Sequence, residues 1–90
     1  MIEREVEICN PLGLHARAAA RFVRLASEFQ ARVKVERGGR VMDGKSILGM
    51  LLLAASKGTR LRLLVDGADE AQAAEALAAL VANGFGEVNE

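Results

Sequence analysis

Three segments of the chain alternate apolar with charged side chains, which is the two-residue period of a β-strand with one face in water. These segments lie at residues 3–8, 31–36 and 60–65. A shorter strand is expected at residues 40–42, after the Gly38-Gly39 turn. Strands of a parallel sheet are buried on both faces and read as continuous apolar runs, so the charged faces favour an antiparallel sheet that is covered on one side only.

Helical patterns follow the first, third and fourth of these strands. Apolar residues three or four positions apart predict a helix over about residues 16–27. Ser46 is a good N-cap for a second helix, which is expected to end near Gly58. Asp69, with Gln72 three residues later, resembles a capping box and predicts a third helix after it.

The resulting order is βαββαβα, which predicts one α+β domain over residues 1–90. We expect an open-faced β-sandwich, in which three helices pack on the apolar face of a four-stranded antiparallel sheet. A chain of 90 residues fills one small domain and leaves no room for a deep, enclosed substrate cavity. If the first and last strands are neighbours, Glu5 or Glu7 is expected to pair with Arg60 or Arg62.

The charges are distributed unevenly along the chain, although their sum is zero. Residues 1–62 hold all 12 lysines and arginines, whereas residues 63–90 hold acidic residues and no base. Such a molecule offers a basic face to an acidic protein partner. Zero net charge and an aromatic content of 3% argue against a nucleic-acid partner.

Several other kinds of site and location are not expected. The single cysteine, Cys9, excludes an internal disulfide and a cysteine-based zinc site, and we expect it to be a buried or half-buried residue without a role. With one histidine and no matching carboxylate spacing, neither a metal site nor a cofactor is expected. The charged start MIEREVEI lacks a secretory apolar segment, and the uncharged run from Ser46 to Ser56 is too short to cross a bilayer. We therefore predict a cytoplasmic protein without a membrane partner.

The only histidine, His15, stands between a Pro/Gly turn and the first turn of a predicted helix. The backbone N–H groups of Ala16, Arg17 and Ala18 have no partners within that helix, and with the helix dipole they form an anion site. The Arg17 guanidinium is within reach of a phosphate held there, and imidazole is a nucleophile near neutral pH. The pattern fits a phosphoryl acceptor, although an ordinary surface histidine at a helix start has the same spacing.

The segment Gly-Leu-His-Ala-Arg-Ala-Ala-Ala at residues 13–20 resembles the active-site motif of the HPr family. That family comprises the phosphocarrier proteins of the phosphoenolpyruvate-dependent phosphotransferase system. A second match, Asp-Gly-Lys-Ser-Ile-Leu-Gly at residues 43–49, lies where the family has its regulatory serine segment. The resemblance covers essentially the whole chain and implies a carrier in sugar transport rather than an enzyme. It also implies that phospho-enzyme I phosphorylates His15 on Nδ1, that Arg17 steadies the phosphoryl group, and that an EIIA-type domain receives it.

Two further implications of the resemblance concern Ala18 and Ser46. The family usually has proline directly after the arginine, and versions with Ala or Ser there often serve the nitrogen-related phosphotransfer chain. A protein-binding regulatory function in that branch is therefore the alternative to sugar uptake. The resemblance also implies that HPr kinase/phosphorylase phosphorylates Ser46, which is expected to cap a helix as well. A regulatory module modified only on Ser46 and an interaction module without phosphotransfer both remain open.

Every residue from Ile47 to Ala55 is apolar or glycine, so the second helix has no polar face. A small open-faced sandwich cannot bury a helix on all sides, and we expect the exposed part to form a docking patch with a basic rim. The alternatives are a fully buried helix and an arginine row that is merely solvated. The chain is expected to be a monomer. The predicted docking residues are Arg17, Ala20, Arg21, Arg24, Ile47, Leu48, Leu51 and Leu52.

Overall fold

The strands of the protein form one antiparallel sheet in a computed structural model that describes residues 1–87. The order of the strands across the sheet is β1-β4-β2-β3. The order along the chain confirms the predicted βαββαβα arrangement, with a short 3-10 turn, η1, added at the end. The elements are β1 (Ile2–Glu7), α1 (Ala16–Ala26), β2 (Arg32–Arg37), β3 (Arg40–Asp43), α2 (Ile47–Leu52), β4 (Arg60–Asp66), α3 (Glu70–Ala82) and η1 (Gly84–Gly86).

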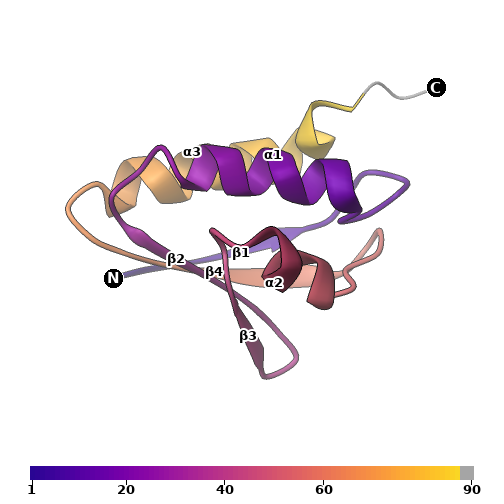
Figure 1. Cartoon of the computed structure of the whole chain (residues 1–90), viewed down its shortest axis with the longest axis horizontal. Coiled ribbons are helices and arrows are strands. Elements are labelled where there is room, and N and C mark those ends of the chain that lie inside the picture. The colour runs from indigo at the N-terminus through magenta and orange to yellow at the C-terminus, as the bar shows by residue number, and fades with distance from the viewer. Residues whose placement is uncertain (88–90) are drawn as a thin grey trace.

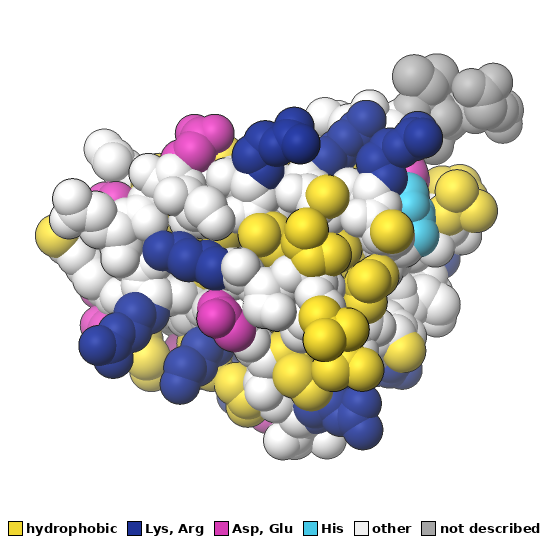
Figure 2. All heavy atoms as spheres, in the orientation of Figure 1, with side chains coloured by type: hydrophobic (Ala, Val, Ile, Leu, Met, Phe, Trp, Pro, Cys, Tyr) yellow, Lys and Arg dark blue, Asp and Glu magenta, His cyan; other side chains and the backbone are white. Residues whose placement is uncertain are grey.

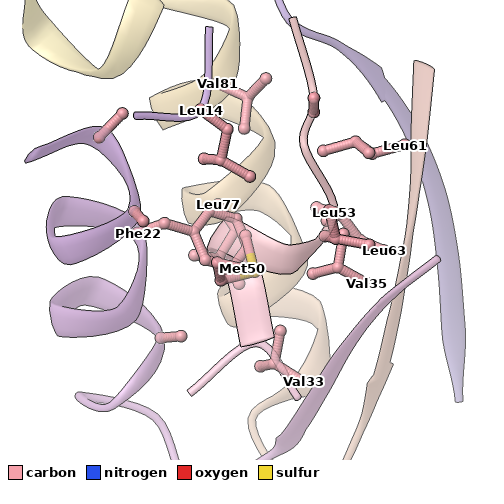
Figure 3. Close-up of a cluster of buried hydrophobic side chains, with 14 of the residues drawn as sticks. Leu14, Phe22, Val33, Val35, Met50, Leu53, Leu61, Leu63, Leu77 and Val81 are labelled. Carbon is pink, nitrogen blue, oxygen red and sulfur yellow. The ribbon is translucent and has the colours of Figure 1, made fainter. Parts of the chain in front are cut away.

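The helices cover one face of the sheet and leave the other face in water, as the strand alternation predicts (Figure 1). On the covered face, Leu61, Leu63 and Val65 of β4 are buried, whereas Arg60 and Arg62 between them are exposed. Phe22 of α1, Met50 of α2 and Leu77 of α3 meet these strands in the core (Figure 3). The open-faced α+β sandwich is therefore confirmed.

The predicted pairing of the first and last strands is also confirmed. Glu5 lies opposite Arg62 and Glu7 lies opposite Arg60 in the antiparallel register of β1 and β4. Arg60 Nε lies 3.6 Å from a Glu7 carboxylate oxygen, and Arg60 Nη1 lies 3.9 Å from a Glu5 carboxylate oxygen. Because these pairs are largely in water, each contributes about 0–1 kcal/mol and serves mainly to favour this register.

Helix α2 is shorter than predicted, because it ends at Leu52 rather than near Gly58. Ala54 adopts a positive φ of 50°, which stops the helix in the manner of a left-handed C-terminal cap. Arg37 Nη1 donates to the Leu53 and Ala54 carbonyls at 2.7 and 2.9 Å, and Arg40 Nη1 donates to the Leu52 carbonyl at 3.0 Å. Guanidinium groups from the β2–β3 hairpin thus satisfy carbonyls that a longer helix would have used itself.

The capping box predicted at the start of α3 is wrong, although Asp69 is the N-cap residue. Its carboxylate makes no cap bond and instead accepts from the backbone N–H groups of Gln30 and Ala31, at 2.9 and 2.8 Å. These contacts, that of Gln30 above all, hold the pKa of Asp69 below its ordinary value. Asp69 therefore ties the α1–β2 loop to the start of α3.

The expectation that Cys9 is buried or half-buried is wrong as well. Cys9 follows β1 between two buried residues, Ile8 and Asn10, and the alternation of the extended chain turns its own side chain outward. Its Sγ lies 3.3 Å from the Val81 carbonyl oxygen at the end of α3.

Within residues 1–87, no helix has the length and apolar content that a bilayer crossing requires.

Candidate phosphoryl-acceptor site

His15 is the N-cap residue of α1 and has an extended backbone, with φ −81° and ψ 179°. Its Nδ1 accepts a hydrogen bond from the backbone N–H of Arg17 at 3.2 Å. Nδ1 therefore carries the lone pair of the ring, and the ring hydrogen of neutral imidazole lies on Nε2. The structure thus places an unprotonated nitrogen at the start of a helix, where backbone N–H groups and the helix dipole favour an anion.

The turn before His15 is anchored to the chain that follows α2. Leu14 N donates to the Ala55 carbonyl at 2.8 Å, and the Leu14 side chain is buried. Gly13 has a φ of 67°, and a Cβ at this position would lie 2.6 Å from the same Ala55 oxygen. Only glycine fits here, because a side chain would clash with the backbone of Ala55 and because L-residues rarely adopt this φ. The close approach of Gly13 to Ala55 therefore fixes the position of the neighbouring His15.

A carboxylate from the far end of the chain contacts the other ring nitrogen. Glu87 Oε2 and His15 Nε2 form a hydrogen bond, in which Nε2 is the donor because Nδ1 is already an acceptor. Glu87 Oε1 accepts from Asn10 Nδ2 at 2.7 Å, and the same amide nitrogen donates to the Gly13 carbonyl at 2.7 Å. The hydrogen bond from His15, followed by that from Asn10, holds the pKa of Glu87 below its ordinary value. Sequence reasoning did not find Glu87, because nothing in its local pattern points to His15.

The three arginines of α1 differ in their surroundings. Arg17 and Arg24 are exposed, and no hydrogen bond or ion pair involves either guanidinium within residues 1–87. Arg21 is half-buried, and its Nη1 donates to the Phe85 carbonyl at 2.6 Å. The Arg21 guanidinium therefore also holds the turn at Phe85, which distinguishes it from Arg17 and Arg24 in the predicted basic rim.

The exposed side of α2 forms an apolar patch, which rules out the fully buried helix. Its four members are 36–68% exposed, and Figure 2 shows hydrophobic side chains gathered below a row of basic ones, with the histidine at one end. The buried residues Gly49 and Met50 attach the helix to the rest of the protein. The apolar patch consists of Ile47, Leu48, Leu51 and Leu52.

Ser46 caps α2, as predicted. Its Oγ accepts a hydrogen bond from the Gly49 backbone N–H at 3.0 Å. The residue is half-buried and directly precedes the apolar patch. A charge added to this hydroxyl would therefore lie beside Ile47 and Leu48.

Among residues 1–87, no group of three or more His, Cys, Asp or Glu side chains is placed to hold a metal ion.

An imidazole nitrogen at a helix start, beside a broad apolar surface with basic neighbours, suits a protein that carries a group between other proteins. Comparison with known proteins shows the family. The family model described as the "PTS HPr component phosphorylation site" matches residues 2–83. The chain therefore belongs to the HPr family, the phosphocarrier proteins of the phosphotransferase system, which are not themselves enzymes.

Relatives cover nearly the whole chain. The phosphocarrier protein HPr of Cupriavidus necator is 51% identical over 87 residues, which are 97% of this chain and 98% of that protein. The phosphocarrier protein NPr of Shewanella violacea is 43% identical over 88 residues, covering 98% of this chain and 97% of that protein.

Solved structures agree with the fold. A crystal structure of HPr from Thermoanaerobacter tengcongensis has a TM-score of 0.94 and 42% identity, covering 99% of this chain and 100% of that one. A crystal structure of an HPr dimer from the same organism has a TM-score of 0.77 and 42% identity, covering 97% and 100% of the two chains.

Proposed function

We propose that this phosphocarrier takes its phosphoryl group on Nδ1 of His15, from phospho-enzyme I, and passes it to an EIIA-type domain. The proposal rests on the hydrogen bond from the Arg17 backbone N–H to Nδ1. Because Nδ1 accepts this bond, it has a lone pair and carries no hydrogen. The ring is 27% exposed, so a partner can approach it. The contribution of the protein to each transfer is positioning and charge stabilisation.

The same groups that orient the ring are placed to hold the phosphoryl group. When Nδ1 binds phosphorus, the Arg17 N–H loses its acceptor and can donate to a phosphoryl oxygen instead. The neighbouring N–H groups of Ala16 and Ala18 start the same helix. The exposed Arg17 guanidinium supplies a charged donor within the same turn. Arg17 is therefore the arginine that steadies the phosphoryl group.

Incubation with phosphoenolpyruvate and enzyme I tests this proposal. The chain should take up one phosphoryl group in an acid-labile and base-stable form, as a phosphoramidate does, and a phosphorus–nitrogen coupling at Nδ1 should identify the nitrogen. Uptake that is stable in acid and depends on ATP rather than phosphoenolpyruvate would contradict the proposal. That result would favour a regulatory module modified on Ser46 only.

The partners would dock on the apolar patch and the basic residues beside it. Exposed apolar side chains with basic residues beside them suit an acidic protein surface with an apolar centre. The proposed docking set keeps Arg17, Ala20, Arg24 and the apolar patch. Arg21 contributes only in part, because its guanidinium also binds the Phe85 carbonyl. The 90 residues would act as one monomeric domain in the cytoplasm, without a membrane or nucleic-acid partner.

The phosphoryl group could be delivered to either of two branches of the phosphotransferase system. Sugar uptake is the first candidate, since the more similar of the two relatives above is an HPr. The nitrogen-related branch is the alternative, because the family's usual proline is replaced by Ala18 and an NPr is also similar. Ala18 is fully buried, so it acts on the helix rather than on a partner. Transfer rates from the labelled chain to an EIIA of each branch would decide between them.

Ser46 offers a second point of control, through HPr kinase/phosphorylase. A phosphate on its Oγ would add a charge of about −1.5 to −2 beside the apolar patch and repel an acidic partner. Ser46→Asp keeps an N-cap but adds a charge, whereas Ser46→Asn keeps the cap without one. We expect Ser46→Asp alone to raise the KM for phosphorylation by enzyme I, by about tenfold if the repulsion costs about 1.4 kcal/mol. Equal KM values for the two variants would contradict this mechanism.

A further inference from the structure

One polar group at the site has no part in the transfer described above, namely the Glu87 carboxylate. We infer that Glu87 is a positioning residue, which orients the His15 ring and stabilises the hydrogen on Nε2 while Nδ1 gains and loses the phosphoryl group. This inference deepens the function proposed for His15 and rests on it.

The first support is that the ring is held at both nitrogens. The Arg17 N–H donates to Nδ1, and Nε2 donates to Glu87. A ring fixed at two points cannot rotate to exchange its nitrogens, so Nδ1 stays on the side of the helix start. A carboxylate that sets the tautomer and orientation of a histidine is a common device in sites where imidazole acts as nucleophile, base or ligand.

The second support is that Glu87 is itself held in place. Its other oxygen accepts from Asn10 Nδ2, and Asn10 is 3% exposed. Because the same amide nitrogen binds the Gly13 carbonyl, the carboxylate is linked to the turn that precedes His15. The Glu87 side chain is 16% exposed. Such a carboxylate is sheltered from water, in contrast to the largely exposed acids of the sheet.

The third support is the turn at residues 84–87, which brings Glu87 to the ring. Phe85 is buried in the core with a φ of 59°, and its carbonyl accepts from Arg21 at 2.6 Å. The Glu87 N–H donates to the Gly84 carbonyl at 3.1 Å, which closes the turn. A non-glycine residue in the left-handed region costs free energy, so the packing of Phe85 has to maintain this path. The carboxylate thus reaches His15 along a built turn rather than by a chance surface contact.

The chemistry needs a hydrogen on Nε2 throughout. In the first transfer, the Nδ1 lone pair forms the N–P bond while the bond between phosphorus and the donor breaks. The ring keeps its Nε2 hydrogen and becomes a phosphoimidazolium, whose positive charge lies against the carboxylate. In the second transfer, the nucleophile of the EIIA-type domain forms a bond to phosphorus while the N–P bond breaks. The electron pair of that bond returns to Nδ1, and neutral imidazole leaves. Without the Nε2 hydrogen, the leaving group would be an imidazolate anion, which is far less favourable.

Glu87→Gln tests the inference, because glutamine keeps the size and polarity of the side chain but removes the charge. We expect the rate constant for transfer to an EIIA-type domain at saturating acceptor to fall about tenfold, as for other carboxylates that orient a histidine. The KM should not change, since Glu87 is not on the apolar patch. The ¹⁵N spectrum of the unphosphorylated ring should show that the Nε2–H tautomer is less populated. Glu28→Gln is the matched control, because it removes a charge from an exposed residue just beyond the last turn of α1.

A pH measurement gives a readout that does not depend on any partner. The folded-state pKa of Glu87 lies below its ordinary value of 4.5, because His15, Asn10 and the Arg21 charge favour the carboxylate. Its contribution to the free energy of unfolding is therefore fully present above about pH 4.5, and it is lost as the pH falls through the folded-state pKa. Urea unfolding of Glu87→Gln should lack this part of the acid destabilisation, whereas Glu28→Gln should retain it.

The outcomes separate the inference from the proposed function. If the unchanged protein carries the phosphoryl group but Glu87→Gln matches Glu28→Gln in rate and ring spectrum, the positioning inference is overturned and the function stands. A faster transfer by Glu87→Gln would overturn it too, because the carboxylate would then shield the ring. If the unchanged protein takes up no phosphoryl group, the function at His15 fails, and the role of Glu87 in transfer fails with it.

Discussion

Replacing His15 with asparagine is expected to abolish phosphoryl uptake from phosphoenolpyruvate and enzyme I while leaving the fold intact. The His15 side chain has two functions in the structure, since it is the proposed nucleophile and also the N-cap of α1. Asparagine is among the best N-cap residues, and its amide oxygen can accept from the Arg17 N–H in place of Nδ1. It has no nitrogen that can hold a phosphoryl group. Radiolabel uptake per chain would measure the loss.

His15→Ala separates the two functions, because it removes the nucleophile and the cap together. We expect it to lose uptake completely as well, and to lower the free energy of unfolding by about 1 kcal/mol more than His15→Asn does, because both variants lose the hydrogen bond to Glu87 and only His15→Ala also loses the cap. Urea unfolding of the three proteins would show this difference. Acid-labile, base-stable label in either variant would mean that another residue is the acceptor.

Replacing Leu48 with glutamate is expected to weaken docking on enzyme I strongly without unfolding the protein. Leu48 is 68% exposed, so the substitution removes little from the core. In a complex with an acidic-rimmed partner, the variant would lose apolar contact and place a negative charge against negative charges. Truncation of a hot-spot residue near the centre of an interface costs about 2 kcal/mol or more, which corresponds to a rise of about 30-fold in Kd. The KM for phosphorylation by enzyme I and the affinity measured by calorimetry should both show it.

Val41→Glu is the matched control for this prediction. Val41 is 47% exposed and lies on β3, the edge strand, outside the apolar patch. The Val41→Glu variant undergoes the same kind of change in polarity and charge as Leu48→Glu, and it should leave the KM for phosphorylation by enzyme I unchanged. An equal effect of both variants would show that net charge, rather than the apolar patch, governs docking.

Local patterns were sufficient to predict most of the fold. The alternation in residues 60–65 predicts a strand with one wet face, and β4 has buried Leu61, Leu63 and Val65 between exposed arginines. Helix α2 ends six residues before the end near Gly58 that the sequence predicts, because the composition stays helical to Ala55 and a glycine follows at position 58. Arg37 and Arg40, which bind its final carbonyls, come from a hairpin earlier in the chain. Helix ends of this kind depend on contacts that composition does not contain.

The sequence by itself determined that one imidazole stands at a helix start, with Arg17 in the next turn and a serine cap before an apolar helix. It determined these features because each depends on residues within one or two turns of one another. Only the tertiary structure decided that Glu87 binds the second nitrogen of His15, 72 positions away, and that Arg21 holds the turn which brings it there. The burial of Phe85 and Asn10 is what brings Glu87 back to the start of α1. Such a contact arises from packing, and no local spacing encodes it.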